Sequence, residues 1–162
     1  KVFVYRLSEV KRFILEAGNS YLISLRDELR FSKAYLHIQK ERFGDNLQVQ
    51  RDLPPALENE LIIPMSLQML LENAVKHNVI SRAKPLLIQV YAEGERLVVQ
   101  NKIQAKSTQL PTTKLGLKNI EQRYALISEK QVHISNEAGC FTVKIPLLSK
   151  AIQKNTYASI DH

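Results

Sequence analysis

Apolar side chains recur at helical spacing along the first part of the chain. Residues 1–16 carry an apolar stripe with charged residues on the other side, which predicts an amphipathic helix. After the break AGNS (17–20), a second helix is predicted between Ser24, a favoured N-cap residue, and Gly44, in the favoured C′ position. The two helices would form a helical hairpin, whose apolar seam has to pack on a second copy or on the domain that follows.

The hydrophobic period changes from helical to alternating after Gly44. NLQVQRDL predicts a strand over 46–53, and the following PPALENEL has the turn chemistry of a loop. Pro64 is expected at the first position of a helix that covers about residues 65–79. The rest of the predicted order is a hairpin over 85–103 that turns at Gly94, a loop over 104–115, a helix over 116–127 and a second hairpin over 131–147 that turns at 136–139.

These elements define the expected fold class and domain organisation. Residues 45–148 have the order β–loop–α–ββ–loop–α–ββ, in which strands occur mainly as hairpins and helices occur singly. That order predicts an α+β fold, a two-layer sandwich with helices on one face of a mixed sheet. Residues 1–44 would be a helical segment before this domain, and residues 149–162 would be a C-terminal tail without pattern.

Composition and charge narrow the class of partner only slightly. The 162 residues carry a net charge of +7, which favours a nucleotide, nucleic acid or acidic membrane face, or is a basic surface without a special partner. The basic residues are spread along the chain, which argues against a nucleic-acid-binding arm. The single Cys140 excludes an internal disulfide and fits a reducing compartment. Because the chain begins with Lys1 rather than Met, in an amphipathic pattern, we expect it to be a piece of a longer protein.

The stretch LLENAVKHNV (70–79) places several polar side chains in one of the most apolar parts of the chain. With about 3.6 residues per turn, one half of this helix would carry Gln68, Met69, Glu72, Asn73, Lys76 and His77. The pattern is compatible with a solvated polar face. It is also compatible with a site for a divalent metal and phosphate, since an Asn carbonyl is a hard oxygen ligand and a Lys can reach phosphate oxygens.

Three motifs in order resemble those of one family. LLENAVKHNV is similar to the N-box of the GHKL ATP-binding fold, and its E-N-A-x-K-H is a histidine-kinase form of that motif. SLRDELRFSKAYLHIQKERFG (24–44) resembles the helix that precedes the ATP-binding domain in LytS-type sensor histidine kinases. IPMSLQMLLENAVKH matches the N-box run of that group, and GLKNIEQRYALI (116–127) resembles its G2 segment. The resemblance covers nearly residues 20–147 and implies the GHKL, or Bergerat, fold.

The resemblance also implies roles for residues of the site. Asn73 would coordinate the Mg²⁺ that bridges the ATP phosphates, and Glu72 would be the base or orienting carboxylate for phosphoryl transfer. Lys76 and His77 would lie near the phosphates. The remaining implied elements are a glycine turn at a helix N-terminus, formed by Gly116 and Leu117, and a lid over the nucleotide, formed by residues 102–115. Without the resemblance, Gly116 would be a simple helix-entry glycine.

Two positions depart from the family pattern. Asn101 stands where the family has the Asp that accepts the adenine amino group, and no glycine follows it. An Asn oxygen can still accept that hydrogen bond, without the charge. Lys114 replaces the first glycine of the usual G-x-G-L, where it would either add a positive charge near the phosphates or obstruct the turn. We therefore expect ATP binding to be retained but weakened.

The phosphoacceptor histidine of the family is absent from its expected segment. His37 is placed in the middle of the second helix, His133 in a strand and His162 at the end of the chain, and none is expected to be the acceptor. Residues 1–44 would be a remnant of the dimerisation and phosphoacceptor region. The chain alone would therefore bind ATP–Mg²⁺ without phosphorylating itself.

The resemblance also suggests how the whole protein works. It would be a homodimeric, bacterial inner-membrane kinase with this part in the cytoplasm, passing phosphate to a LytR-like response regulator without direct nucleic-acid contact. Two alternatives stay open. One is a degenerate GHKL domain used for dimerisation or interaction. The other is a GHKL ATPase of the DNA-repair or chaperone class, against which the Y-L-x-I-x-x-x-R-F helix and the short lid argue.

Overall fold

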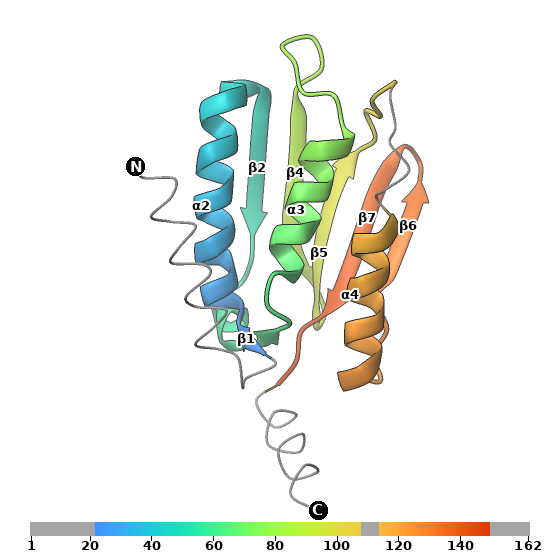
Figure 1. Cartoon of the computed structure of the whole chain (residues 1–162). Helices are drawn as coiled ribbons and strands as arrows, with labels where there is room; N and C mark the ends of the chain where they lie inside the picture. The colour runs from blue at the N-terminus through green and yellow to red at the C-terminus, as the bar shows by residue number, and fades with distance from the viewer. Residues whose placement is uncertain (1–21, 108–113, 150–162) are drawn as a thin grey trace, which may run out of the picture.

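A five-stranded mixed sheet covered on one face by three helices forms the part of the chain that the computed structural model describes, residues 22–107 and 114–149 (Figure 1). The predicted helix over 1–16, residues 108–113 of the predicted lid and the tail beyond Ser149 lie outside the described residues. The helices are α2 (Leu25–Phe43), α3 (Ser66–His77) and α4 (Lys114–Ile127), with 3₁₀ turns η1 (Gly44–Asn46) and η2 (Pro55–Asn59). The strands are β1 (Ile23–Ser24), β2 (Leu47–Asp52), β3 (Leu61–Ile62), β4 (Leu86–Glu93), β5 (Arg96–Lys102), β6 (His133–Glu137) and β7 (Cys140–Pro146).

The main sheet has the strand order β2-β4-β5-β7-β6. Strand β2 runs parallel to β4, and the other neighbouring strands are antiparallel. Both predicted hairpins form. In the β6–β7 hairpin the two turn residues, Ala138 and Gly139, have φ of 52° and 74°, as a two-residue turn with the right twist requires. The α+β two-layer sandwich predicted from the sequence is thereby confirmed.

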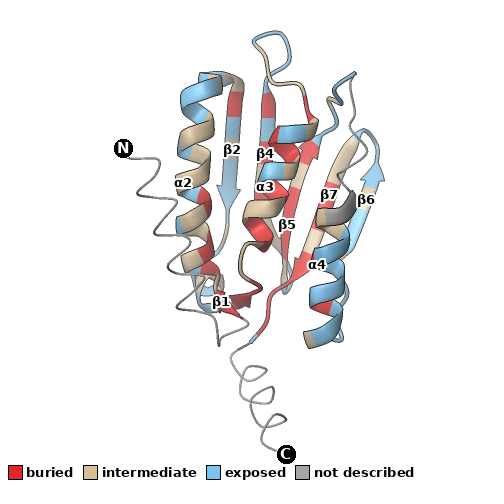
Figure 2. Ribbon diagram, viewed as in Figure 1, coloured by how far each residue is buried: buried red, intermediate tan, exposed pale blue. Residues whose placement is uncertain are grey.

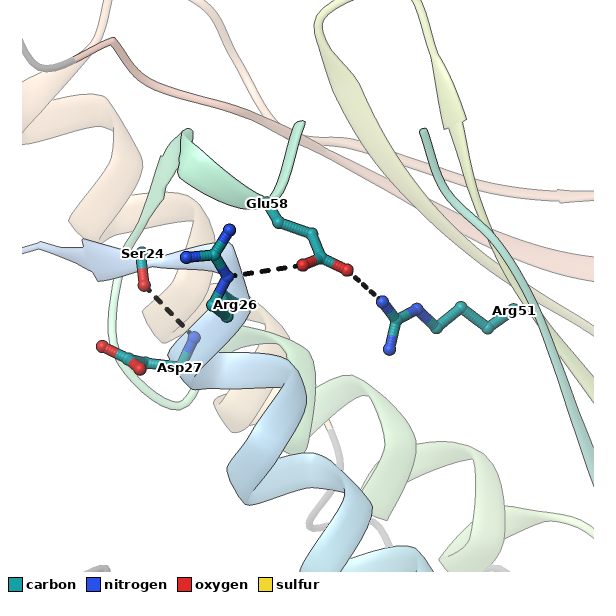
Figure 3. A network of polar contacts seen from close by, with 5 residues as sticks. All are labelled: Ser24, Arg26, Asp27, Arg51 and Glu58. Atoms are coloured by element: carbon teal, nitrogen blue, oxygen red, sulfur yellow. Dashed lines mark hydrogen bonds and ion pairs between the residues drawn. The ribbon is translucent and has the colours of Figure 1, made fainter. Parts of the chain in front are cut away.

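Helix α2 begins and ends where the sequence indicates. The Ser24 side chain accepts a hydrogen bond from the Asp27 backbone N at 3.2 Å, and Gly44, with φ of 57°, donates its N–H to the Lys40 carbonyl. Beside this cap, the Glu58 carboxylate lies between Arg26, 3.5 Å away, and Arg51 (Figure 3). Because both arginines are largely exposed, these ion pairs add little stability, but they join the start of α2 to η2 and β2.

Helix α3 does not begin at Pro64, so the prediction of Pro64 at the first helical position is wrong. The N-cap is Met65, which has a left-handed φ of 69°, and the helix covers Ser66–His77. The chain makes a tight turn first, since both the backbone N and the hydroxyl of Ser66 donate to the Ile63 carbonyl. Pro64 and Met65 occupy this turn, which displaces the helix start by one to two residues.

Three smaller features also differ from the prediction. Helix α4 begins at Lys114, so the predicted loop loses its last two residues and Gly116 lies inside the first turn. The segment predicted as a loop after β2 contains η2 and leads into the two-residue strand β3, which pairs with β1. Two-residue strands cannot show alternation, which is why the pattern does not reveal β1 and β3.

The hydrophobic core lies between the sheet and the helices, where the inner faces of both layers are buried (Figure 2). The largest fully buried side chains include Leu25, Leu47, Ile62, Leu67, Leu71, Leu86, Ile88, Leu97, Tyr124, Ile145 and Leu148. None of the helices in the described ranges combines the length and the hydropathy that a membrane crossing needs. The core holds α3 at the centre of the helical layer, between α2 and α4 (Figure 1).

Candidate functional site

The two faces of α3 differ as the pattern predicts. Leu67, Leu70, Leu71, Ala74 and Val75 are buried against the sheet. On the opposite face Glu72 and Lys76 are exposed, whereas Asn73 and His77 are half-buried. The Gln68 side-chain amide donates to the Glu72 carboxylate at 3.2 Å. Asn73 makes no side-chain hydrogen bond within the described part of the chain, so its amide is available to a ligand.

The C-terminal end of α3 is attached to the segment that follows β5. The side chain of Asn78 donates to the Ala74 carbonyl at 2.8 Å and accepts from the Gln104 backbone N at 2.7 Å. The Lys106 backbone N donates to the His77 carbonyl at 3.3 Å. The first residues of the predicted lid are therefore held directly beside the polar face of α3.

His77 has an unused polar atom at this junction. Its Nε2 is buried and has no hydrogen-bond partner within the described residues. Burial, and then the positive charges of Lys76 and Lys106, lower the pKa of His77 below its ordinary value of 6.5. The imidazole is therefore neutral at neutral pH, and the fold leaves its Nε2 without a partner within the described residues.

The first turn of α4 lies against the N-terminal half of α3. A Cβ added to Gly116 would lie 3.4 Å from Cε of Met69 on α3, so the absence of a side chain permits the close approach of the two helices. The first N–H groups of α4 have no partner within the helix, and the helix dipole makes this end favourable for an anion. Leu117 packs against the core, and the side chain of Lys114 lies outside the described residues.

Asn101 lies near the end of β5, where it is only 4% exposed. It is paired with Ile88 of β4 and Phe141 of β7, and its side-chain amide donates to the Lys102 carbonyl at 2.7 Å. That bond orients the amide so that the nitrogen is occupied. The position is buried enough to hold a planar polar group in a fixed orientation.

The C-terminal end of α3 and the end of β5 lie at the same end of the molecule, and α4 begins lower, beside α3 (Figure 1). They suit an anionic ligand, because Lys76 supplies a positive charge and the α4 N-terminus supplies backbone N–H donors. This donor set alone cannot complete the coordination of a Mg²⁺ ion, since Asn73 supplies only one hard oxygen. Oxygens of the ligand and of water would have to complete the shell. Among the described residues no group of three or more His, Cys, Asp or Glu side chains could hold a metal.

The histidines in the described ranges that are not on α3 lie elsewhere. His37 is exposed in α2, where its Nε2 is 3.5 Å from the Glu41 carboxylate, and His133 is exposed on β6. His162 lies outside the described residues. Sequence reasoning missed Gln104 and Asn78, which hydrogen-bond to each other across the lid junction.

Sequence comparison relates the chain to bacterial sensor kinases. A family model described as "Histidine kinase" matches residues 1–47. The sensor protein LytS of Enterococcus faecalis is 26% identical over 155 residues, which are 86% of this chain and 25% of that protein. LytS of Staphylococcus haemolyticus is 33% identical over 90 residues, 56% of this chain and 15% of that protein. The chain thus spans a quarter or less of the length of these relatives.

Solved structures with the same fold are histidine kinases. The cytoplasmic segment of QseC has a TM-score of 0.56 at 18% identity, with 88% of this chain and 91% of that chain covered. A nucleotide-free catalytic domain of ThkA has a TM-score of 0.56 at 14% identity, over 77% of this chain and 95% of that chain. Full-length ShkA in complex with AMPPNP has a TM-score of 0.50 at 16% identity, over 79% and 31%. The chain is therefore similar in sequence to LytS-type sensor histidine kinases and has the fold of histidine kinase catalytic domains, as its motifs predicted.

Proposed function

We propose that this chain is the ATP-binding catalytic part of a two-component sensor histidine kinase. The observation that carries the proposal is the junction at the C-terminal end of α3. There a half-buried Asn73 with a free amide lies one turn from the buried, unpartnered Nε2 of His77, beside the first lid residues. The start of α4 lies against the same helix, where Gly116 is close to Met69, one turn before Asn73. Such a site suits a polyphosphate better than a neutral ligand.

Each residue of the candidate site has a distinct role in this proposal. The amide oxygen of Asn73 would hold Mg²⁺, which when bound neutralises charge on the phosphate oxygens. Lys76 and the first N–H groups of α4, around Gly116 and Leu117, would bind phosphate oxygens. The side-chain oxygen of the buried Asn101 would accept a hydrogen bond from the adenine amino group. The exposed carboxylate of Glu72, oriented by Gln68, would position or deprotonate the acceptor imidazole.

The reaction requires partners that this chain does not supply. The γ-phosphoryl group would move from ATP, leaving ADP, to a histidine of the longer protein and then to an aspartate of a response regulator. We propose a LytR-like regulator, a homodimeric kinase and a membrane-anchored sensor with this part in the cytoplasm. The support is the similarity to LytS proteins, of which this chain spans a quarter or less.

Titration with Mg·AMP-PNP tests the proposal directly. Calorimetry on the chain should show saturable binding that weakens when EDTA removes Mg²⁺. No saturable binding at millimolar nucleotide, with Asn73→Ala indistinguishable from wild type, would contradict it. That outcome would favour the alternative of a degenerate GHKL domain used for dimerisation or interaction.

A second experiment separates binding from chemistry in the longer protein. Glu72→Gln should retain Mg·AMP-PNP binding and lose transfer of the γ-phosphoryl group to the acceptor histidine. Gln68→Ala, which removes only the partner of Glu72, is the matched control and should retain most of the transfer. Full activity of the Glu72→Gln protein would exclude Glu72 from the reaction.

A further inference from the structure

The N-terminal end of α3 is held by a side chain from another helix. Its own N-cap, Met65, has no side-chain capping bond. Instead the carboxylate of Glu28, on α2, accepts hydrogen bonds from the backbone N of Met65 at 3.0 Å and of Gln68 at 3.2 Å. Glu28 is 0% exposed, so these bonds replace its lost hydration. A buried carboxylate at a helix N-terminus also interacts favourably with the helix dipole.

Helix α4 is attached to the same turn by Tyr124, which is also 0% exposed. Its hydroxyl accepts a hydrogen bond from the Ile63 backbone N at 3.2 Å and lies 3.4 Å from the Ser66 hydroxyl. Burial, with a smaller contribution from the charge of Glu28, raises the pKa of Tyr124 to about 12, so the phenol remains protonated. Glu28, Tyr124 and Ser66, with the backbone that they bind, form one buried cluster, here called the polar node.

The polar node joins three helices at one point. Helix α2 precedes α3 in the chain, and α4 follows the predicted lid. Helix α3 carries Asn73 and His77 towards its other end. At about 1.5 Å of rise per residue, the twelve residues of α3 extend over roughly 18 Å. The far end is bonded to the segment after β5 through Asn78 and Gln104.

We propose that Glu28 and Tyr124 are positioning residues for the nucleotide site, because they fix the start of α3 to the helices on either side of it. The inference rests on the proposed function only where its test measures nucleotide affinity. The connection runs through direct contacts and the helix backbone. Glu28 on α2 bonds the first turn of α3, and α3 carries Asn73 and His77. A displacement of α2 in the longer protein would thereby reach the site without passing through the sheet.

Glu28→Gln is the variant that tests this connection, and Asp27→Asn is its control. Both remove one negative charge from the first turn of α2, but only Glu28 contacts α3. Amide hydrogen exchange and amide chemical shifts are measured without nucleotide, and the Kd for Mg·AMP-PNP is measured separately. Loss of hydrogen bonds to a charged group should make exchange about 10-fold faster along α3 and raise the Kd by a similar factor, about 10-fold. Asp27→Asn should change both by less than about twofold.

The pattern of the changes distinguishes positioning from simple capping. We expect amide shifts in Glu28→Gln to move at the far end of α3 and at Gln104–Lys106. Changes confined to Met65 and Gln68, with the Kd unchanged, would overturn the proposal. If wild type binds no nucleotide, the proposed function fails, and the shifts at the far end still decide whether the node positions α3.

Tyr124→Phe provides an independent variant should Glu28→Gln fail to fold. It removes only the hydroxyl, and Tyr91→Phe is the control, because the Tyr91 hydroxyl donates to Gln100 within the sheet. Tyr124→Phe should shift the same amides at the far end of α3 and raise the Kd about fivefold or more. Tyr91→Phe should leave α3 unchanged, and equal effects of the two variants would overturn the proposal.

Discussion

The two ends of helix α3 differ in how their polar side chains are bonded. At the N-terminal end Glu28 and Tyr124 are fully buried, and their polar atoms bind the backbone of the turn that starts the helix. At the C-terminal end Asn73 makes no side-chain hydrogen bond within the described part, and Nε2 of His77 is buried without a partner. One end is therefore held by side chains of α2 and α4, and the other carries the groups that we propose bind a ligand.

The difference between the ends shows how polar residues on a single helix divide between stability and function. A buried polar group without a partner costs free energy, and Nε2 of His77 is one such group in the described part of the chain, together with Oε1 of Gln68 and Oγ of Ser32. Asn73 and Asn78 illustrate the division five residues apart, since the amide of Asn78 is hydrogen-bonded on both sides. Variants at these positions should separate binding from stability.

Replacing Asn73 should have the largest effect on binding. Asn73→Ala removes the proposed Mg²⁺ ligand, and we expect affinity for Mg·AMP-PNP to fall by about 10-fold to 100-fold. Stability should not fall, since Ala is the better helix residue by about 0.5 kcal/mol. Calorimetric titration and urea unfolding measure the two quantities. A large loss of stability with unchanged affinity would reverse the assignment of this end of α3.

Replacing Asn78 should have the opposite outcome. Asn78→Ala leaves the Gln104 backbone N without its partner, and we expect a loss of about 1–3 kcal/mol in the free energy of unfolding. The measurement is urea unfolding followed by circular dichroism. Affinity should fall less than in Asn73→Ala when both variants are measured fully folded. If Asn78→Ala is as stable as wild type, the lid junction does not depend on this amide.

Removing the charge of Lys76 should have a smaller effect. Lys76→Ala removes an exposed positive charge, so we expect the Kd for Mg·AMP-PNP to rise about threefold to fivefold, and less at high salt. Lys33→Ala, which removes an exposed lysine from α2, is the control and should change the Kd by less than about twofold. Equal effects of the two substitutions would mean that only net charge matters.

The titration of His77 should show the smallest effect. Burial and the neighbouring lysines lower its pKa in the folded state below 6.5, so folding favours the neutral imidazole. The stability that this contributes is present above pH 6.5 and is lost as the pH falls through 6.5 towards the lowered pKa. An NMR titration of the imidazole, assigned with His77→Gln, should have its midpoint below 6.5. A midpoint at 6.5 would mean that solvent dominates there, and a midpoint above 6.5 that a carboxylate does.

Much of the fold could be predicted from local signals. Ser24 and Gly44 mark the ends of α2 because a cap depends on residues within one turn. The period of apolar residues predicts both hairpins and the buried face of α3 for the same local reason. Pro64 misleads, since the turn before α3 depends on hydrogen bonds of Ser66 and on Glu28, which comes from another helix.

The candidate site also contains residues that the sequence reveals and residues that it does not. Asn73, Lys76 and His77 are recognisable because they occupy adjacent turns of one helix, and their motif resembles a known family. Their roles stay predictions until a ligand is measured, as do the domain boundaries. Glu28 reads in the sequence as an ordinary acidic residue in the first turn of α2, and only its neighbours in space make it the cap of α3.

By itself, the sequence predicted helices α2, α3 and α4, both hairpins and the polar face of α3, because each leaves a pattern within a few residues. Only the tertiary structure decided how the ends of α3 are used. The bonds from Glu28 and Tyr124 to this helix, and from Asn78 to Gln104, join residues that lie 26 to 61 positions apart along the chain. Hydrogen bonds over such separations leave no periodic trace, since they require only that two buried polar groups meet after folding.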